Sequence, residues 1–153
     1  MTELQKCTIA KQKGFKYNQE SGEIIGIKGE AIRKKNAYGY IVCSYRINHQ
    51  RYAIYSHRLA WFLHYGELPK KQIDHIDGNK INNRISNLRD VSNQENAFNF
   101  VNAKGYSWDP INKKFAARIK LNYRNKFLGR FNTEEEARNA YLKAKEKYHV
   151  INK

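Results

Sequence analysis

A stretch rich in asparagine and aspartate, with Gly78 among them, occupies the middle of the chain, at residues 70–99. Asn and Asp side chains hydrogen-bond to nearby backbone groups, and Gly permits tight turns, so this composition favours turns over regular structure. The segments on either side have regular apolar patterns. We therefore expect an α+β fold in which regular elements hold an irregular central segment, and we expect the chemistry to lie in that segment.

Before this stretch, the sequence predicts two β-hairpins and one helix. The first hairpin spans residues 17–27, where Ser-Gly separates two short β-prone runs. The second joins residues 39–47 to residues 51–56, two runs rich in Tyr, Ile and Val. Helical spacing follows over residues 57–66, where Gly66 is the expected C-terminal stop.

After the stretch, new patterns begin at a boundary near residues 100–104. Apolar and cationic residues alternate over residues 114–121, which predicts a strand with one apolar and one cationic face. Residues 122–125 are predicted to form a turn, and Thr133 to Glu136 to form a capping box that opens a helix. We therefore divide the chain into domains at residues 1–100 and 101–153.

The chain is strongly basic, with 29 Lys and Arg against 14 Asp and Glu and a net charge of +15. Such an excess favours a polyanionic partner, with nucleic acid first. A basic membrane-surface helix is disfavoured because the basic residues are spread among aromatics along the whole chain. No apolar run is long enough to span a membrane.

The two cysteines, Cys7 and Cys43, lie far apart and have no CxxC partner. Neither a disulfide framework nor a cysteine zinc site is therefore supported. The first residues also lack the apolar core of a signal peptide. These features together predict a soluble, cytoplasmic protein.

The central motif reads QIDHIDGNKINNRISNLRDVSNQENAFN over residues 72–99. A calcium loop is excluded, because aligning Gly78 with the invariant glycine of that loop puts Ile73 and Arg84 where oxygen ligands are required. The elements DHIDGN, NNR, NLR and QEN-xx-N resemble the HNH endonucleases of phage and intron origin, and the resemblance spans about residues 15–100. It implies a ββα-metal motif at about residues 72–99.

The resemblance also implies roles for four residues. Asp74 corresponds to the first metal ligand, His75 to the general base, Asn87 to the orienting asparagine and Asn96 to the second metal ligand. Carboxylate and carboxamide oxygens are hard ligands, so one Mg²⁺ or Mn²⁺ ion is expected. An imidazole exchanges its proton near neutral pH, and His75 is therefore suited to take a proton from the attacking water.

One position departs from the usual family pattern, and several further polar residues are given supporting or structural roles. Many family members have histidine where this chain has Asn96, a change that favours Mg²⁺ or Mn²⁺ over zinc and leaves open an inactive site. His57 is expected to play a supporting role. The remaining polar residues are interpreted as loop formers: Asp77, Asn79, Asn82 and Asn83.

The C-terminal pieces KGYSWDP, KFAARI, LGRF and TEEEARNAY, within residues 104–148, resemble the AP2 DNA-binding domain. That resemblance implies a three-stranded antiparallel sheet packed on one helix, with the exposed sheet face along DNA. The expected DNA contacts in this region are basic and aromatic residues: Lys104, Trp108, Arg118, Lys120, Arg124, Lys126 and Arg130. Arg58, near the start of the helix predicted over residues 57–66, is also an expected DNA contact.

Two functions remain open. The first is a metal-dependent endonuclease, of nicking or homing type, that acts on double-stranded DNA in the cytoplasm of an infected bacterial host cell. One active site hydrolyses one strand, so a monomer would nick and a homodimer could cut both strands. The second is a non-catalytic DNA-binding protein or regulator derived from a decayed HNH nuclease. RNA is disfavoured because no RNA-binding signature is present.

Overall fold

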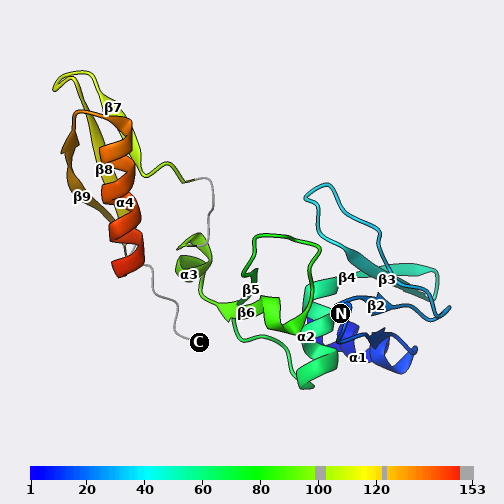
Figure 1. Ribbon diagram of the computed structural model, residues 1–153. Coiled ribbons are helices and arrows are strands. Elements are labelled where there is room, and N and C mark those ends of the chain that lie inside the picture. The colour runs from blue at the N-terminus through cyan, green and yellow to red at the C-terminus, as the bar shows by residue number, and fades with distance from the viewer. Residues whose placement is uncertain (99–102, 122–123, 149–153) are drawn as a thin grey trace. The chain divides into compact units, whose positions relative to one another are not determined.

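The computed structural model describes residues 1–98, 103–121 and 124–148, and its chain divides into two compact units, Met1–Val91 and Ser92–Lys153 (Figure 1). The described residues form an α+β fold with four small antiparallel sheets. No helix in the described parts is long and apolar enough to cross a bilayer. The first unit contains α1 (Glu3–Gln12), β1 (Lys16–Tyr17), β2 (Ile24–Ile25), β3 (Val42–Ile47), β4 (Gln50–Tyr55), α2 (Ser56–Tyr65), β5 (Gln72–His75), η1 (Ile85–Asn87) and β6 (Leu88–Val91).

Both predicted hairpins of the first unit are confirmed. Strand β1 pairs with β2, and β3 pairs with β4 in a register that puts Ile47 opposite Gln50. The two turn residues between them, Asn48 and His49, both have positive φ, which matches the twist that a two-residue hairpin needs. The predicted helix is also confirmed as α2, and Gly66 ends it in the left-handed conformation with φ +79°.

Helix α1 is not predicted by apolar spacing, because only Cys7 and Ala10 of this helix are buried. Its start is set by a capping box instead. The Thr2 side chain accepts a hydrogen bond from the backbone of Gln5, and the Gln5 side chain accepts one from the backbone of Thr2. The helix therefore depends on its cap and on a narrow buried contact.

The core of the first unit brings α1, α2 and the β3–β4 pair together. Leu59 and Ala60 of α2 are fully buried, and both cysteines are buried free thiols. The other members of this core are Ala10, Phe15, Ile24, Tyr45, Ile54 and Phe62. Because α2 is anchored in this core, it forms a rigid support for the segment that follows it.

Strands β5 and β6 follow α2 and form a separate antiparallel pair. Their register puts Asp74 opposite Arg89 and His75 opposite Leu88. The loop between the strands returns through η1, where the backbone N–H of Ile76 donates to the carbonyl of Asn87 at 2.9 Å. This pair holds the central polar motif.

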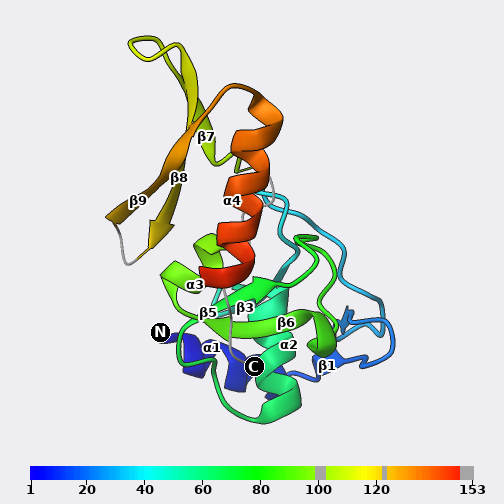
Figure 2. The same ribbon diagram turned by 60° about the vertical axis from the view of Figure 1, so that its left-hand side comes forward.

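The second unit begins with α3 (Asn93–Phe98) and continues with β7 (Tyr106–Asp109), β8 (Lys114–Leu121), β9 (Arg124–Phe131) and α4 (Glu134–Tyr148). Strands β7, β8 and β9 form a three-stranded antiparallel sheet in that order, and α4 runs along one face of it (Figures 1 and 2). The strand predicted at residues 114–121 is confirmed, as is the capping box of Thr133 and Glu136.

The predicted turn of this unit is only partly borne out. Of the predicted turn at residues 122–125, Arg124 and Asn125 belong to strand β9, while residues 122–123 lie outside the described residues. Gly105 has φ +79°, and a Cβ atom there would lie 2.0 Å from the ring of Tyr141. Glycine is therefore needed where the chain enters β7. The predicted domain boundary between residues 100 and 101 also lies outside the described residues and stays a prediction.

Candidate functional site

Strand β5 ends in two buried polar side chains, Asp74 and His75, which are only 8% and 5% exposed. Buried polar groups must be hydrogen-bonded, because losing water without a replacement partner costs about 1–3 kcal/mol for each group. The partners of these two side chains therefore define the site. They come from the loop after β5 and from strand β6.

His75 is held by an asparagine that the sequence suggested was only a loop former. Its ring Nε2 lies 3.0 Å from Oδ1 of Asn83, and the Asn83 side chain is 2% exposed. A loop-forming asparagine would be expected at the surface. The burial of Asn83 marks it as part of the site.

Asp74 is held by Arg89 from the neighbouring strand. The Arg89 Nε and Nη2 atoms both donate to Oδ2 of Asp74, at 2.8 and 2.6 Å. The two residues are directly opposite each other in the register of β5 and β6. The proposed metal ligand thus carries a compensating positive charge from its own chain.

Asn87 closes the loop between the two strands. Its Oδ1 accepts from the backbone N–H of Asp77 at 3.1 Å, and its Nδ2 donates to the Asp77 carboxylate and to the carbonyl of Asn82, both at 2.9 Å. Asp77 is two residues beyond His75. Asn87 therefore orders the backbone just after the histidine. The hydrogen bond to the His75 ring described above comes from Asn83.

A cluster of aromatic rings surrounds the other side of His75. The ring of His57 meets the His75 ring edge-on with 5.3 Å between centroids, and it stacks on Tyr55 at 5.4 Å. Tyr40 lies 5.4 Å from His57 and 6.2 Å from His75. Burial, with smaller effects of the His75 and Arg58 charges, lowers the pKa of His57 to about 3. His57 is therefore a neutral packing partner of His75.

Arg58, a predicted DNA contact, points toward α1. Its Nε donates to the carboxylate of Glu3, and its Nη2 donates to the same group at 2.7 Å. The Arg58 side chain is only 20% exposed. Its role in DNA binding stays a prediction, and in the structure its charge is neutralised by α1.

Asn96 lies in α3 and therefore belongs to the second unit. The start of this helix is set by Ser92 and Glu95: the Ser92 backbone N–H and hydroxyl both donate to the Glu95 carboxylate at 2.7 Å. The backbone N–H of Asn96 donates to the carbonyl of Ser92. The predicted pairing of Asn96 with Asp74 around a metal stays a prediction.

The predicted metal donors are the Asp74 carboxylate and the Asn96 carboxamide. Within residues 1–98, 103–121 and 124–148, no group of three or more His, Cys, Asp or Glu side chains gathers to hold a metal ion. Two oxygen donors with open positions for phosphate and water suit a hard divalent ion. Because Asp74 is bound to Arg89, a cation at Asp74 would compete with the guanidinium.

The predicted DNA contacts of the second unit fall on two faces of its sheet. Residues that pair directly across antiparallel strands share a face. Arg118 pairs with Phe127, and Arg130 pairs with Ala116. We call the face that carries Ser107, Arg118, Lys120, Phe127 and Arg130 the outer face. The guanidinium groups of Arg118 and Arg130 lie 5.9 and 5.2 Å from the Phe127 ring centroid.

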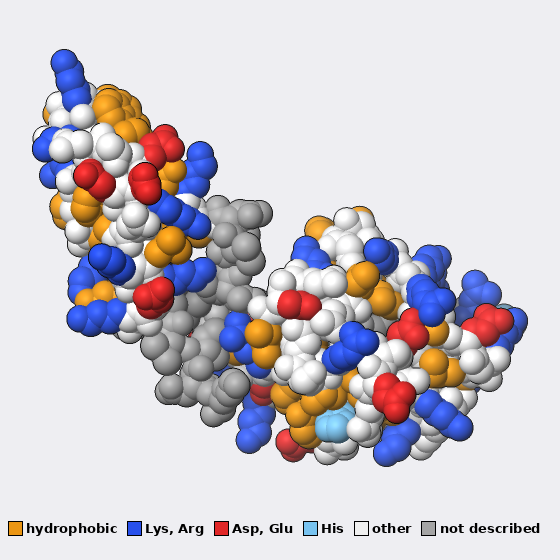
Figure 3. Space-filling model, in the orientation of Figure 1, with side chains coloured by type: hydrophobic (Ala, Val, Ile, Leu, Met, Phe, Trp, Pro, Cys, Tyr) orange, Lys and Arg blue, Asp and Glu red, His pale blue; other side chains and the backbone are white. Residues whose placement is uncertain are grey.

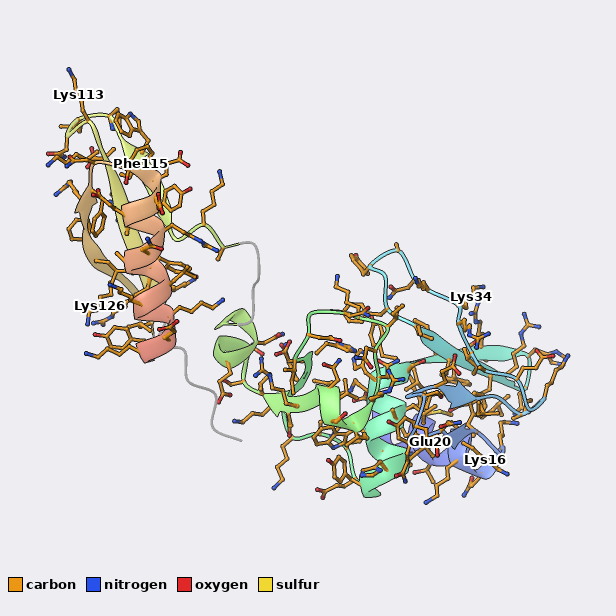
Figure 4. All side chains as sticks on the ribbon, viewed as in Figure 1. Lys16, Glu20, Lys34, Lys113, Phe115 and Lys126 are labelled. Atoms are coloured by element: carbon orange, nitrogen blue, oxygen red, sulfur yellow. The ribbon has the colours of Figure 1, made fainter. Side chains whose placement is uncertain are left out.

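The remaining predicted contacts of the sheet share a face with α4. Lys126 pairs with Ile119, which packs on α4, and its Nζ donates to the hydroxyl of Tyr148 at 2.8 Å. Figure 4 shows Lys126 beside the C-terminal end of α4. Arg124 pairs with Leu121 and Trp108 pairs with Phe115, which puts both on the same side as Ile119. Lys104, just before β7, is exposed.

Positive charge is widely distributed over each unit. Figure 3 shows Lys and Arg side chains across the visible face of both units, with Asp and Glu side chains among them. On the outer face, Arg130 donates to Asp109 at 2.9 Å, and this bond is the main reason that the pKa of the Asp109 carboxyl falls to about 2. Arg130 is therefore partly neutralised, whereas Arg118 makes a long contact to the Ser107 hydroxyl at 3.5 Å and lies over the Phe127 ring.

Comparisons with known proteins give two matches. Residues 54–98 match the family model described as HNH endonuclease. The chain is also similar to a solved structure described as DNA binding and cleavage by the HNH homing endonuclease I-HmuI, with 29% sequence identity and a TM-score of 0.45. That match covers 56% of this chain and 50% of the other, so the chain matches about half the length of that protein. No curated protein matches the chain.

The matched segment contains residues 72–98 of the central motif. It runs from the end of β4 to the end of α3 and includes Asp74, His75, Asn87 and Asn96. The residues buried together at the end of β5 are therefore part of the region that the family model describes. The chain carries an HNH endonuclease family domain at residues 54–98.

Proposed function

We propose that this chain is a metal-dependent endonuclease that hydrolyses phosphodiester bonds in double-stranded DNA. The observation that carries the proposal is that Asp74 and His75, the last two residues of β5, are both buried polar side chains inside the segment that matches HNH endonucleases. A carboxylate next to an imidazole supplies a ligand for a hard cation and an acceptor for the proton of water.

The residues of the chain divide this work. Asp74 and Asn96 would hold one Mg²⁺ or Mn²⁺ ion, which when bound screens the charge of the scissile phosphate and stabilises the leaving oxygen. His75 takes a proton from the attacking water. Asn87 and Asp77 hold the loop after His75 in one conformation, so the ring is presented from a fixed backbone.

The second unit would grip the DNA, as its resemblance to AP2 domains implies. The outer face is best suited to this, because Arg118, Lys120 and Arg130 present cationic groups there without packing on α4. Arginine can bind guanine or phosphate through two parallel hydrogen bonds, and lysine binds phosphate as a point charge. We place the protein in the cytoplasm of an infected bacterial host, as a nicking monomer or a homodimer, because the resemblance is to phage nucleases.

One observation favours a second function, that of a non-catalytic DNA-binding protein. Asp74 already forms a charge-assisted pair with Arg89, and this pair stabilises the β5–β6 hairpin without a metal. A decayed nuclease could retain the pair for structure alone. The two functions predict opposite results with DNA and metal.

A plasmid assay separates the two functions. The full chain, incubated with supercoiled plasmid and Mg²⁺ or Mn²⁺, should convert it to relaxed circles, and a chelator should prevent this. We expect His75→Ala to lower the nicking rate by roughly 10²- to 10⁴-fold with plasmid binding retained. His49→Asn is the matched control, because this exposed histidine has φ +65°, which asparagine tolerates. Plasmid binding without nicking by the unaltered chain would favour the non-catalytic function.

A further inference from the structure

We infer that Asn83 is a positioning residue that selects the ring tautomer of His75, so that Nε2 carries the proton and Nδ1 is the atom that accepts the proton of water. This inference rests on the proposed function and specifies the chemistry of the same histidine. It goes beyond the roles implied by the HNH resemblance, which assign the orienting asparagine to Asn87.

The contact that carries the inference is direct and buried. Oδ1 of Asn83 lies 3.0 Å from Nε2 of His75, and the two side chains are 2% and 5% exposed. A carbonyl oxygen can only accept, so the ring must donate from Nε2. A neutral imidazole has one N–H, and the lone pair then belongs to Nδ1.

Asn83 is held in place by a tyrosine from the start of the chain. The Tyr17 hydroxyl donates to the main-chain carbonyl of Asn83 and accepts from the backbone N–H of Ile85, both at 3.1 Å. One side chain thus holds the backbone on both sides of Arg84. The peptide that carries the Asn83 side chain is therefore fixed to strand β1.

A second contact holds the same backbone from the other side. Gly22 has φ +77°, and a Cβ atom there would lie 2.5 Å from the backbone nitrogen of Arg84. The Arg84 Nε donates to the carbonyl of Glu20 at 2.8 Å. The β1–β2 hairpin therefore contacts residues 83–85 from two sides. In our proposal, these contacts hold Asn83 against His75.

His75 cannot turn away from Asn83 easily, because His57 packs edge-on against its ring with 5.3 Å between centroids. His57 is itself enclosed by Tyr40 and Tyr55. Packing thus sets the plane of the His75 ring, while Asn83 sets which nitrogen holds the proton. These are separate effects and can be removed separately.

The tautomer can be measured without DNA or metal. Nitrogen-15 spectra of the full chain at alkaline pH, where imidazoles are neutral, should show His75 with its proton on Nε2. A proton on Nδ1 in the unaltered chain would overturn the inference even if the protein is an active nuclease. A correct tautomer in a chain that shows no metal-dependent nicking would leave the Asn83 contact in place and remove the proposed function.

Variants of Asn83 test the effect on catalysis. Asn83→Leu removes the acceptor and keeps the branching and the number of heavy atoms of the side chain. We expect kcat for plasmid nicking to fall by roughly 10- to 100-fold with little change in KM, as when the orienting partner of a functional histidine is lost. Asn83→Asp keeps an acceptor oxygen and should restore most of kcat and the Nε2–H signal. A kcat unchanged in Asn83→Leu would overturn the inference.

Two further variants guard against a trivial loss of folding. Asn79→Ala removes an exposed asparagine of the same loop. Among the described contacts, its side chain accepts a hydrogen bond from the backbone N–H of Ile81. This variant should leave kcat and the His75 tautomer unchanged. Tyr17→Phe keeps the ring and removes the hydroxyl that holds residues 83 and 85. It should lower kcat in the same direction as Asn83→Leu and by less. If Asn83→Leu does not fold, Asn83→Asp and Tyr17→Phe test the inference instead. A normal kcat in Tyr17→Phe, together with a proton on Nδ1 of His75 in Asn83→Asp, would reject the inference.

Discussion

The two units use polar side chains in opposite ways. In the first unit, Asp74, His75, Asn83 and Asn87 are buried and hydrogen-bonded to residues of the same unit. On the outer face of the second unit, Arg118 and Lys120 are exposed. A buried network is sensitive to the loss of one atom, whereas exposed charges act additively and are screened by salt. Substitutions should therefore have large effects in the first unit and small ones in the second.

The largest expected effect comes from breaking the pair of Asp74 and Arg89. Arg89→Met would leave the Asp74 carboxylate buried without its guanidinium partner, and we expect the first unit to lose about 3–5 kcal/mol of unfolding free energy. Mg²⁺ or Mn²⁺ should restore part of this loss, because a cation at Asp74 replaces the missing charge. Urea unfolding followed by Trp61 fluorescence, with Trp108 changed to Phe, reports the first unit alone.

A matched ion pair on the surface sharpens this test. Arg33 pairs with Glu23 at 2.9 Å, and its side chain is 76% exposed. Arg33→Met should cost less than about 1 kcal/mol, because exposed pairs contribute little. Equal losses in the Arg33 and Arg89 variants would show that burial of the Asp74 pair has no energetic importance.

The next effect concerns pH and His57. Its pKa of about 3 lies below the ordinary value of 6.5, so between these two pH values the unfolded chain binds a proton that the folded chain does not. The contribution of His57 to stability is therefore complete above pH 6.5 and is lost as the pH falls toward 3. The expected slope in this window is roughly 1.4 kcal/mol per pH unit.

His57→Phe should flatten that slope, since phenylalanine packs between Tyr40 and Tyr55 but does not titrate. The measurement is the unfolding free energy of the first unit in urea at several pH values. His64→Phe is the comparison, because His64 is exposed on the same helix. A slope that is unchanged in His57→Phe would mean that other groups cause the acid sensitivity.

The sequence predicted local elements well and the partners of the site poorly. Hairpins, helix α2 and the capping box at Thr133 depend on neighbouring residues, so their patterns are visible in the chain. The role of Asn83 depends on Tyr17, which is 66 residues away, and no local signal could reveal it. The pair of Asp74 and Arg89 required the register of β5 and β6, which apolar spacing does not specify in so polar a segment.

The faces of the second unit show a different limit. Simple alternation along β9 puts Arg124, Lys126 and Arg130 on one face. The pairing register shifts between Ala117 and Arg118, so Gly129 pairs with Ala117 while Phe127 pairs with Arg118. The extra residue moves Arg130 to the outer face and leaves Lys126 beside α4. A bulge of this kind is invisible in the alternation, and the predicted contacts were therefore a mixture of both faces.

The smallest expected effect tests that division of faces. Arg118→Ala should weaken DNA binding by a few-fold and reduce the slope of log affinity against log salt by about 1, the value for one lost phosphate contact. Lys126→Ala should change neither, because Lys126 shares a face with Ile119 and its Nζ is bound to Tyr148. Fluorescence anisotropy with a labelled DNA duplex over a range of salt concentrations measures both. An equal loss of slope in the Lys126 variant would mean that the DNA contacts the α4 side of the sheet, because a side chain that the DNA does not approach releases no counterions when it is removed.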